Sequence, residues 1–297
     1  MANQNLVVFI TGGTGFIGRN LVEQLRDKYK ILAPSHQELE LLDEEAVSQY
    51  LRSHKIDVVI HGAIKPGHRN AKDPTNLIYP NTRIFFNLAR NNKYFRKMIW
   101  LSSGAVYDMR YYKPKMSEDY FDTHVPQDET GYYKYICAKY AELSPNIIEL
   151  RPFGVFGKYE DWEIRFISNA ICKTLFDLPI TIKQNRRFDY LYINDLVKVI
   201  EYFIDHETKY KAYNVTPDES IELKILAEKV RSYSGKDLEI KISQPGIGVE
   251  YSGSNFRLRS QIPDLQFTDI DVAIAELYEW YKSNRYLINR DALLIDK

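Results

Sequence analysis

Near its start the chain carries a glycine-rich turn, residues 11–18 with the sequence TGGTGFIG. Residues 6–10 have the length and β-branched content of a buried strand, and residues 20–25 have apolar side chains at helical spacing. A strand, a glycine turn and a helix together predict a dinucleotide-binding site, because the helix N-terminus attracts phosphates. Gly12 would allow the tight turn, Gly15 the approach of a pyrophosphate, and Gly18 close packing of helix on strand. Phe16 and Ile17 are assigned to the same cofactor site.

The composition excludes several classes of function. The 297 residues include 40 basic and 40 acidic ones, so no overall field favours a nucleic acid or a membrane surface as a partner. The two cysteines, Cys137 and Cys172, lie far from any metal-ligand spacing, so we expect no metal site and a reducing compartment. We find neither a signal peptide nor an apolar run of about 20 residues, and we therefore expect a cytoplasmic protein.

Strand-like and helical segments alternate as far as residue 152. Apolar runs at residues 29–33, 58–63, 98–101 and 147–150 are separated by helical patterns at 44–54, 81–92 and 131–143. This alternation predicts an α/β protein with a Rossmann-type doubly wound parallel sheet. Residues 153–297 are less regular and are expected to form a smaller mixed α/β lobe that covers the substrate. The boundary between the domains 1–152 and 153–297 is soft, since residues 189–215 could return to the sheet.

The end of the second predicted strand bears on the choice of cofactor. Residues 34–36 are Pro-Ser-His, without the acidic residue that accepts hydrogen bonds from the ribose of NAD. Ser35 and His36 could instead hold a 2′-phosphate, so NADP(H) is preferred while NAD(H) stays possible. Glu38 is close enough to turn inward and oppose this preference. Asp43 is expected either to cap the next helix or to touch the adenine, and Ala63 ends a strand where a cofactor could lie close.

Tyr135 and Lys139 are four residues apart in a predicted helix and so share one face. Ser103 follows a predicted strand, at the edge where open parallel sheets bind their ligands. These three residues suit hydride transfer to a carbonyl. The Tyr135 hydroxyl would donate a proton to the oxygen, Lys139 would lower the pKa of that hydroxyl, and Ser103 would hydrogen-bond the oxygen.

The motifs at residues 11–18, 101–107 and 135–139 resemble those of the extended short-chain dehydrogenase/reductases. Residues 151–157 and 188–195 are similar to later signatures of their nucleotide-sugar epimerase/dehydratase/reductase group, so the resemblance spans essentially the whole chain. Residues 31–65 look most like NADPH-dependent 4-ketoreductases of the GDP-fucose synthase type. The resemblance implies catalytic roles for Ser103, Tyr135 and Lys139, with Asn81 supporting the lysine through water. It also assigns Lys65, Pro152 and Phe153 to the cofactor.

Departures from the family pattern narrow the expected reaction. Sugar 4,6-dehydratases carry an Asp-Glu pair after the catalytic Ser or Thr, where this chain has Gly104 and Ala105. The Cys and His that GDP-fucose synthase uses for epimerisation are matched here by Ala105 and Arg165. Hydride transfer alone remains. Ser103, Gly104, Arg165 and Arg187 are predicted to bind the substrate, Arg187 through its diphosphate.

The sequence therefore predicts NADP(H)-dependent reduction of a nucleotide-linked 4-keto sugar for surface-glycan synthesis. A 4-epimerase that retains NAD would use the same three residues and stays open as an alternative. A non-catalytic dinucleotide-binding sensor is a third possibility. The segments 81–92 and 131–143 resemble the helices through which this family forms dimers, so a homodimer is expected.

Overall fold

The structure is a computed structural model that describes residues 6–295, and its larger lobe is built on a parallel sheet. Within these residues the sheet has six strands in the order β10-β5-β4-β3-β1-β2, and every neighbouring pair is parallel. The strands are β1 (Val7–Thr11), β2 (Lys30–Leu32), β3 (Val58–His61), β4 (Lys97–Leu101), β5 (Ile147–Pro152) and β10 (Ala212–Val215). The strand order reverses between β1 and β3, and such a switch point forms a crevice at the carboxyl edge of the sheet.

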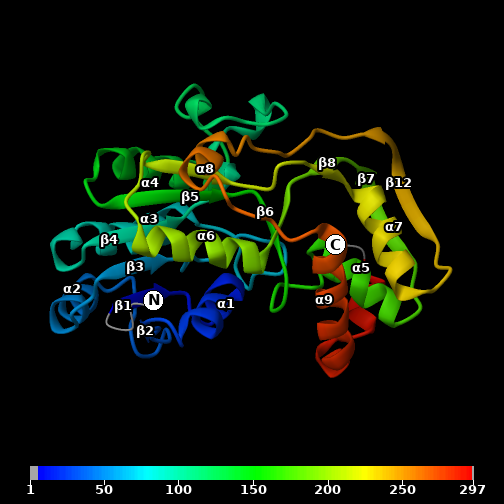
Figure 1. Cartoon of the computed structure of the whole chain (residues 1–297), viewed down its shortest axis with the longest axis horizontal. Helices are drawn as coiled ribbons and strands as arrows, with labels where there is room; N and C mark the ends of the chain where they lie inside the picture. Colours follow the sequence, from blue (N-terminus) through cyan, green and yellow to red (C-terminus); the bar gives the residue numbers. More distant parts are fainter. Residues whose placement is uncertain (1–5, 296–297) are drawn as a thin grey trace.

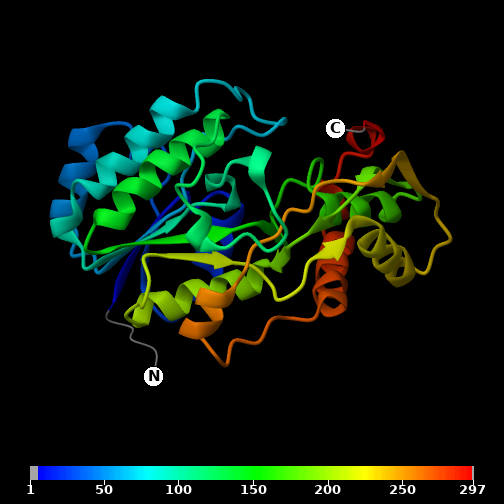
Figure 2. The same cartoon turned by 90° about the horizontal axis from the view of Figure 1, so that it is seen from above.

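Helices cover both faces of this sheet (Figures 1 and 2). Successive side chains of a strand point to opposite faces, so Val8 and Ile10 belong to one core cluster and Phe9 to the other. The first cluster holds helices α1 (Phe16–Leu25) and α6 (Ile193–Asp205). The second holds α2 (Glu44–Ser53), α3 (Ile78–Ala89) and α4 (Glu129–Leu143). The predicted doubly wound α/β fold is confirmed.

The smaller lobe packs helices against short strand pairs (Figure 1). Its main elements are α5 (Phe166–Leu175), β7 (Ile180–Asn185), α7 (Leu223–Ser234), β12 (Ile240–Ile247) and α9 (Ile270–Ser283). Between the lobes lie β6 (Gly154–Phe156) with β9 (Tyr190–Tyr192) and β8 (Arg187–Phe188) with β11 (Ile221–Glu222), whereas α8 (Phe256–Gln261) lies on the larger lobe near α6 (Figures 1 and 2). Short 3₁₀ turns lie at η1 (Asn92–Tyr94), η2 (Gly104–Val106), η3 (Met109–Tyr111), η4 (Glu118–Tyr120), η5 (Arg285–Leu287) and η6 (Asp291–Leu294).

The chain passes repeatedly between the two lobes. After β5 it builds α5 and β7, returns to the sheet through α6 and β10, and then leaves again for α7 and β12. The buried Asp189 ties these crossings together, because it accepts hydrogen bonds from the Thr216 hydroxyl and, at 2.7 Å, from the Gly253 N–H. Burial raises the pKa of Asp189 to about 6. The two lobes are thus joined by several crossing segments of the chain rather than by a single linker.

Candidate active site

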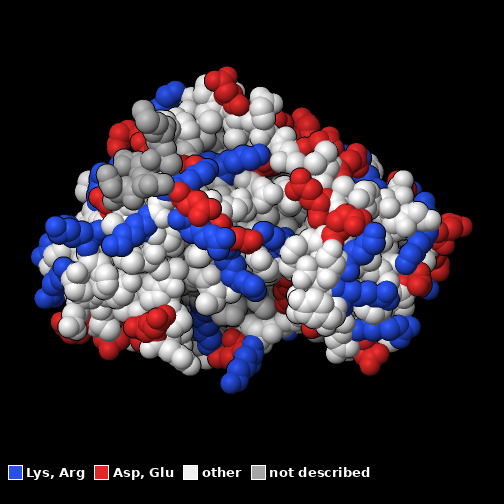
Figure 3. All heavy atoms as spheres, turned by 60° about the horizontal axis from the view of Figure 1, so that its bottom comes forward, with Lys and Arg blue, Asp and Glu red and all other residues white. Residues whose placement is uncertain are grey.

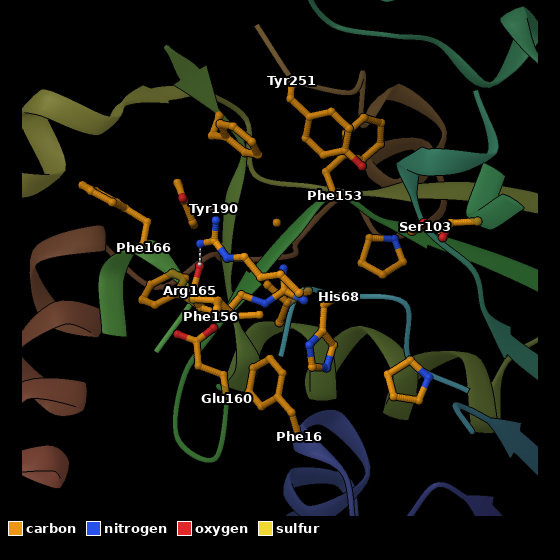
Figure 4. A pocket seen from close by; sticks show the side chains of 18 of the residues that line it. Phe16, His68, Ser103, Phe153, Phe156, Glu160, Arg165, Phe166, Tyr190 and Tyr251 are labelled. Atoms are coloured by element: carbon orange, nitrogen blue, oxygen red, sulfur yellow. Dashed lines mark hydrogen bonds between the residues drawn. The ribbon is translucent and has the colours of Figure 1, made fainter. Parts of the chain in front are cut away.

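A cavity of about 1080 Å³ lies where the carboxyl edge of the sheet meets the smaller lobe. Figure 4 shows Ser103 and Phe153 toward one side of it, and Arg165, Glu160 and Phe16 toward the other. This volume slightly exceeds the ~300–1,000 Å³ of common ligand pockets. The cavity is therefore large enough for a reacting group of a substrate together with part of a cofactor.

The glycine turn between β1 and α1 fits a dinucleotide pyrophosphate. Gly12 has φ +75°, and its carbonyl accepts a hydrogen bond of 3.0 Å from the Gly15 N–H. A Cβ on Gly18 would stand 2.0 Å from the Gly12 oxygen, so only glycine allows α1 to start this close to the turn. A Cβ on Gly15 would meet the Gly12 oxygen alone, at 3.4 Å, which leaves its other side open to a ligand. Phe16 and Ile17 follow and line the cavity.

The loop after β3 is held against this turn. The Thr11 hydroxyl accepts hydrogen bonds of 3.2 Å from the N–H groups of Gly62 and Ala63. Asn81, buried on α3, binds both backbone groups of Lys65, with its side-chain oxygen 2.7 Å from the Lys65 nitrogen. Lys65 lines the cavity, and its ammonium group is paired with Asp73 at 2.6 Å. Asn81 therefore positions the Lys65 loop.

At the end of β2, the predicted 2′-phosphate donors already have partners. The Ser35 N–H donates to Glu38 Oε2 at 2.7 Å, and His36 Nε2 lies 3.1 Å from Glu40 Oε2. Glu38 has turned toward Ser35, and this contact lowers the pKa of its carboxyl. Asp43 caps α2, accepting from the N–H groups of Glu45 and Ala46.

Ser103 lines the cavity directly after β4, and its Oγ accepts a hydrogen bond of 3.2 Å from the Ala105 N–H. Neighbouring Gly104 is tightly enclosed, because a Cβ there would lie 2.7 Å from the Phe153 ring and 2.8 Å from the Tyr251 hydroxyl. Pro152 and Phe153, at the end of β5, line the same cavity.

Helix α4 presents a different pair of residues to the cavity from the one predicted. Thr130, Tyr133 and Lys134 line the cavity, whereas Tyr135 and Lys139 are not among its lining residues in the described part of the chain. With 3.6 residues per turn, Tyr135 and Lys139 lie ~140° and ~180° around the helix from Thr130. Both bind Asp122, the Lys139 ammonium at 2.9 Å. The prediction that Tyr135 and Lys139 face the site is wrong.

The predicted pair shares one helix face, as expected, but that face is the outer one. The Tyr-x-x-x-Lys spacing gives the relation between two residues and not the side of the helix that packs on the sheet. The positions of the small residues could have predicted which side of the helix is buried. The buried stripe of α4 contains Gly131, Cys137, Ala138 and Ala141. Thr130 and Lys134 have the same spacing and lie on that stripe.

The lining residues of the smaller lobe also differ from the prediction at one position. Arg165 lines the cavity as predicted, but Arg187 is not among the described lining residues, since its guanidinium binds the Ser220 hydroxyl at 3.0 Å. Arg186 lines the cavity in its place. The assignment of Arg187 to the substrate diphosphate is therefore wrong, because its side chain is committed to β11 and its surroundings.

Glu160 is a lining residue that the sequence analysis missed. It is only 5% exposed, and its Oε1 accepts a hydrogen bond from the Ser168 hydroxyl. Its Oε2 is buried without a hydrogen-bond partner. Burial raises the pKa of Glu160 to about 8. Nothing in the local sequence distinguishes it from the acidic residues beside it, Asp161 and Glu163.

Within residues 6–295, no group of three or more His, Cys, Asp and Glu side chains could hold a metal ion. No helix in this part of the chain has the length and apolar character required to cross a membrane. Basic and acidic side chains are interspersed over the face drawn in Figure 3.

Comparisons with known proteins agree with this architecture. A GDP-L-colitose synthase from Yersinia pseudotuberculosis is 27% identical over 231 residues, which cover 68% of this chain and 73% of that protein. A dTDP-4-dehydro-6-deoxyglucose reductase from Escherichia coli is 29% identical over 280 residues, covering 80% and 85%. A GDP-L-fucose synthetase from Naegleria fowleri with bound NADP superposes with a TM-score of 0.83 at 17% identity, covering 96% and 95%.

The family assignment follows from these observations. Residues 8–216 match the NAD dependent epimerase/dehydratase family. This range includes the glycine turn and the sheet strands β2, β3, β4, β5 and β10. The relatives are nucleotide-sugar oxidoreductases and epimerases. This chain belongs to the NAD dependent epimerase/dehydratase family.

Proposed function

We propose that this protein reduces a nucleotide-linked 4-keto sugar with NADPH. The observation that carries the proposal is that one cavity is lined by Phe16 and Ile17, which follow the glycine turn, by Ser103 and by the buried residue Lys134. The cofactor supplies a hydride when it is bound. Ser103 would donate a hydrogen bond to the carbonyl oxygen, and Lys134 would stabilise the negative charge that develops there.

The smaller lobe suits a substrate with a nucleoside diphosphate. Arg165, Lys183 and Arg186 line its part of the cavity, and cations of this kind pair with phosphate oxygens. Dehydration of the sugar, and the kind of epimerisation that needs an acid and a base beside the carbonyl, do not fit this site. Gly104 and Ala105 follow Ser103 and provide neither an acid nor a base. Relatives named for reduction at a 4-keto position support the same reading.

A specific observation favours a second candidate, a non-catalytic dinucleotide-binding sensor. Thr130, and not a tyrosine, stands one turn before Lys134 on the face of α4 that lines the cavity. A threonine hydroxyl is a far weaker acid than a phenol. A protein that had lost catalysis could carry this replacement without penalty.

A turnover assay distinguishes the reductase from the sensor. The purified protein is incubated with NADPH and with 4-keto sugars linked to GDP, dTDP or UDP, each generated in situ by a 4,6-dehydratase. We expect NADPH oxidation with one of them and a product two hydrogen atoms heavier by mass spectrometry. Ser103→Ala should lower the rate ~10²-fold, as expected for an oxyanion donor. Cofactor binding without oxidation of NADPH by any substrate would contradict the proposal and favour the sensor.

The epimerase alternative is tested on the same preparation. Nucleotides released from the purified protein by heat are identified by mass spectrometry. Tightly retained NAD, together with interconversion of 4-epimers and no net NADPH oxidation, would favour the epimerase.

A further inference from the structure

Helix α4 brings a hydroxyl and an ammonium group to the cavity one turn apart. Thr130 and Lys134 are four residues apart, the spacing that places two side chains on the same helix face. The first turn of α4 lies against the segment that follows Ser103, since a Cβ on Gly131 would stand 2.8 Å from the Ala105 oxygen. Thr130 and Lys134 thus line the cavity on a helix whose first turn lies against the segment after Ser103.

Lys134 is unusual among the buried lysines. The residue is 5% exposed, and within residues 6–295 no carboxylate lies within 4.0 Å of its ammonium group. Lys97, which is equally buried, instead donates to the carbonyl oxygens of Phe203 and His206. A cation without such partners on a cavity wall is suited to bind and act on a ligand.

Three titratable residues lie around Lys134. His61 faces it from β3, and burial with the Lys134 charge lowers the pKa of His61 to about 3. Cys137 faces it from the next turn of α4, and burial raises the pKa of that thiol. Tyr133 has its ring 5.3 Å from the ammonium nitrogen. Neither His61 nor Cys137 therefore exchanges a proton between pH 6 and 9.

We infer that Lys134 is the proton donor of this site and that the Thr130 hydroxyl passes its proton to the substrate. This inference rests on the proposed reduction. The carbonyl carbon gains a hydride from the reduced nicotinamide, and the C=O π electrons move to the oxygen. That oxygen takes the proton of Thr130 Oγ, and Oγ takes one from Lys134 Nζ. The resulting amine regains its proton from water, the ketone has become an alcohol, and the nicotinamide is oxidised.

The chemistry of the two groups fits these roles. A hydroxyl donates and accepts a hydrogen bond at once, so Thr130 can relay a proton without ionising itself. An unperturbed lysine has a pKa of ~10.4 and an unperturbed tyrosine one of ~10, so an ammonium group can replace a phenol as the acid. The chain therefore keeps a competent acid on the cavity-lining face of α4 although Tyr135 lies on its outer face.

Matched variants test the relay. Thr130→Val removes only the hydroxyl and should lower kcat by ~10²-fold, the lower range for loss of general acid catalysis, whereas Thr130→Ser should stay within a few-fold. Lys134→Arg keeps the positive charge but cannot donate a proton, because arginine holds its proton above pH 12. Its kcat should therefore fall by the same factor as that of Thr130→Val. Lys139→Met, on the outer face of the same helix, is the control.

A binding measurement accompanies the rates. Fluorescence titration should give the same NADPH affinity for Thr130→Val, Thr130→Ser and the unmodified protein, which would show that the hydroxyl is not a structural support. If the unmodified protein reduces a keto sugar and Thr130→Val or Lys134→Arg does so equally well, the relay is wrong and the proposed function stands. If it reduces none, both are overturned.

Discussion

Gly131 of helix α4 lies directly against the carbonyl oxygen of Ala105, in the turn that follows β4. A Cβ at residue 131 would stand 2.8 Å from that oxygen and 2.5 Å from the Pro126 Cβ. The two segments carry Thr130 and Ser103, so their close contact sets the width of the reactive end of the cavity.

Gly131→Ala should therefore move α4 away from Ser103. Crowding of this kind costs ~1–3 kcal/mol in a packed interior, which outweighs the ~1 kcal/mol that alanine gains over glycine in a helix. We expect a lower Tm and a lower kcat. Glu142→Ala, on the exposed side of the same helix, should change neither. A variant at residue 131 with an unchanged Tm and rate would refute this packing argument.

Glu38 is expected to oppose NADPH binding. Its carboxylate holds the Ser35 N–H at 2.7 Å, at the strand end where a 2′-phosphate would sit. Two like charges 4 Å apart repel by ~1 kcal/mol in water, a factor of ~5 in Kd. Glu38→Gln should strengthen NADPH binding by about that factor and leave NADH binding unchanged, measured by fluorescence titration with Glu45→Gln as control.

The unmodified protein should still prefer NADPH to NADH in the same titration. Equal affinity for the two cofactors would contradict the cofactor prediction and would strengthen the epimerase alternative.

An apolar stripe on α4 is expected to form a dimer contact. Tyr132, Ile136, Tyr140 and Leu143 recur at helical spacing, and Leu143 is 89% exposed. Tyr140 packs against Phe86 of α3, with ring centroids 5.1 Å apart, so both helices contribute to the surface. Two copies joined through this surface would bury it as a four-helix bundle.

Leu143→Glu should convert the dimer to a monomer in light scattering at micromolar concentration. Val272→Glu, on the exposed side of α9, is the matched control and should leave the mass unchanged. A monomeric unmodified protein would contradict the prediction.

Glu160 should make the protein less stable as the pH rises. Burial raises its pKa in the folded state to about 8, above the ordinary 4.5 of a glutamate, so the folded state binds its proton more tightly than the unfolded state does. The stability that this proton provides is present at pH 4.5 and is lost as the pH rises toward and through 8. Glu160→Gln, which mimics the neutral acid, should flatten the dependence of Tm on pH between 5 and 9. Parallel curves for the two proteins would contradict the assignment.

The parts of the site that depend on local geometry could be predicted from the sequence. Gly12 and Gly18 are required by a turn that closes within seven residues, and Ser103 by its place after a strand. The side of α4 that faces the cavity could not be predicted in this way, because the contact of Gly131 with Ala105 decides it. Arg186 and Arg187 illustrate the same limit, since neighbours on an extended segment point to opposite sides and the pairing of β8 with β11 selects one.

The short strands β6, β8, β9 and β11 escaped prediction for a related reason. Each has two or three residues, too few to show a period of two, and each pairs with a segment distant in the chain. Where each of these strands begins and ends depends on where the chain crosses between the lobes.

Strand β10 covers the edge of β5, although the chain builds α5, β7 and α6 between them. During translation, at ~5–20 residues per second, strands β1–β5 therefore leave the ribosome several seconds before the strand that closes their sheet. Over that interval the backbone groups of β5 are open to pairing with another nascent chain. A fragment that stops at residue 152 would keep this edge open permanently, so the dinucleotide-binding half should aggregate when it is produced alone.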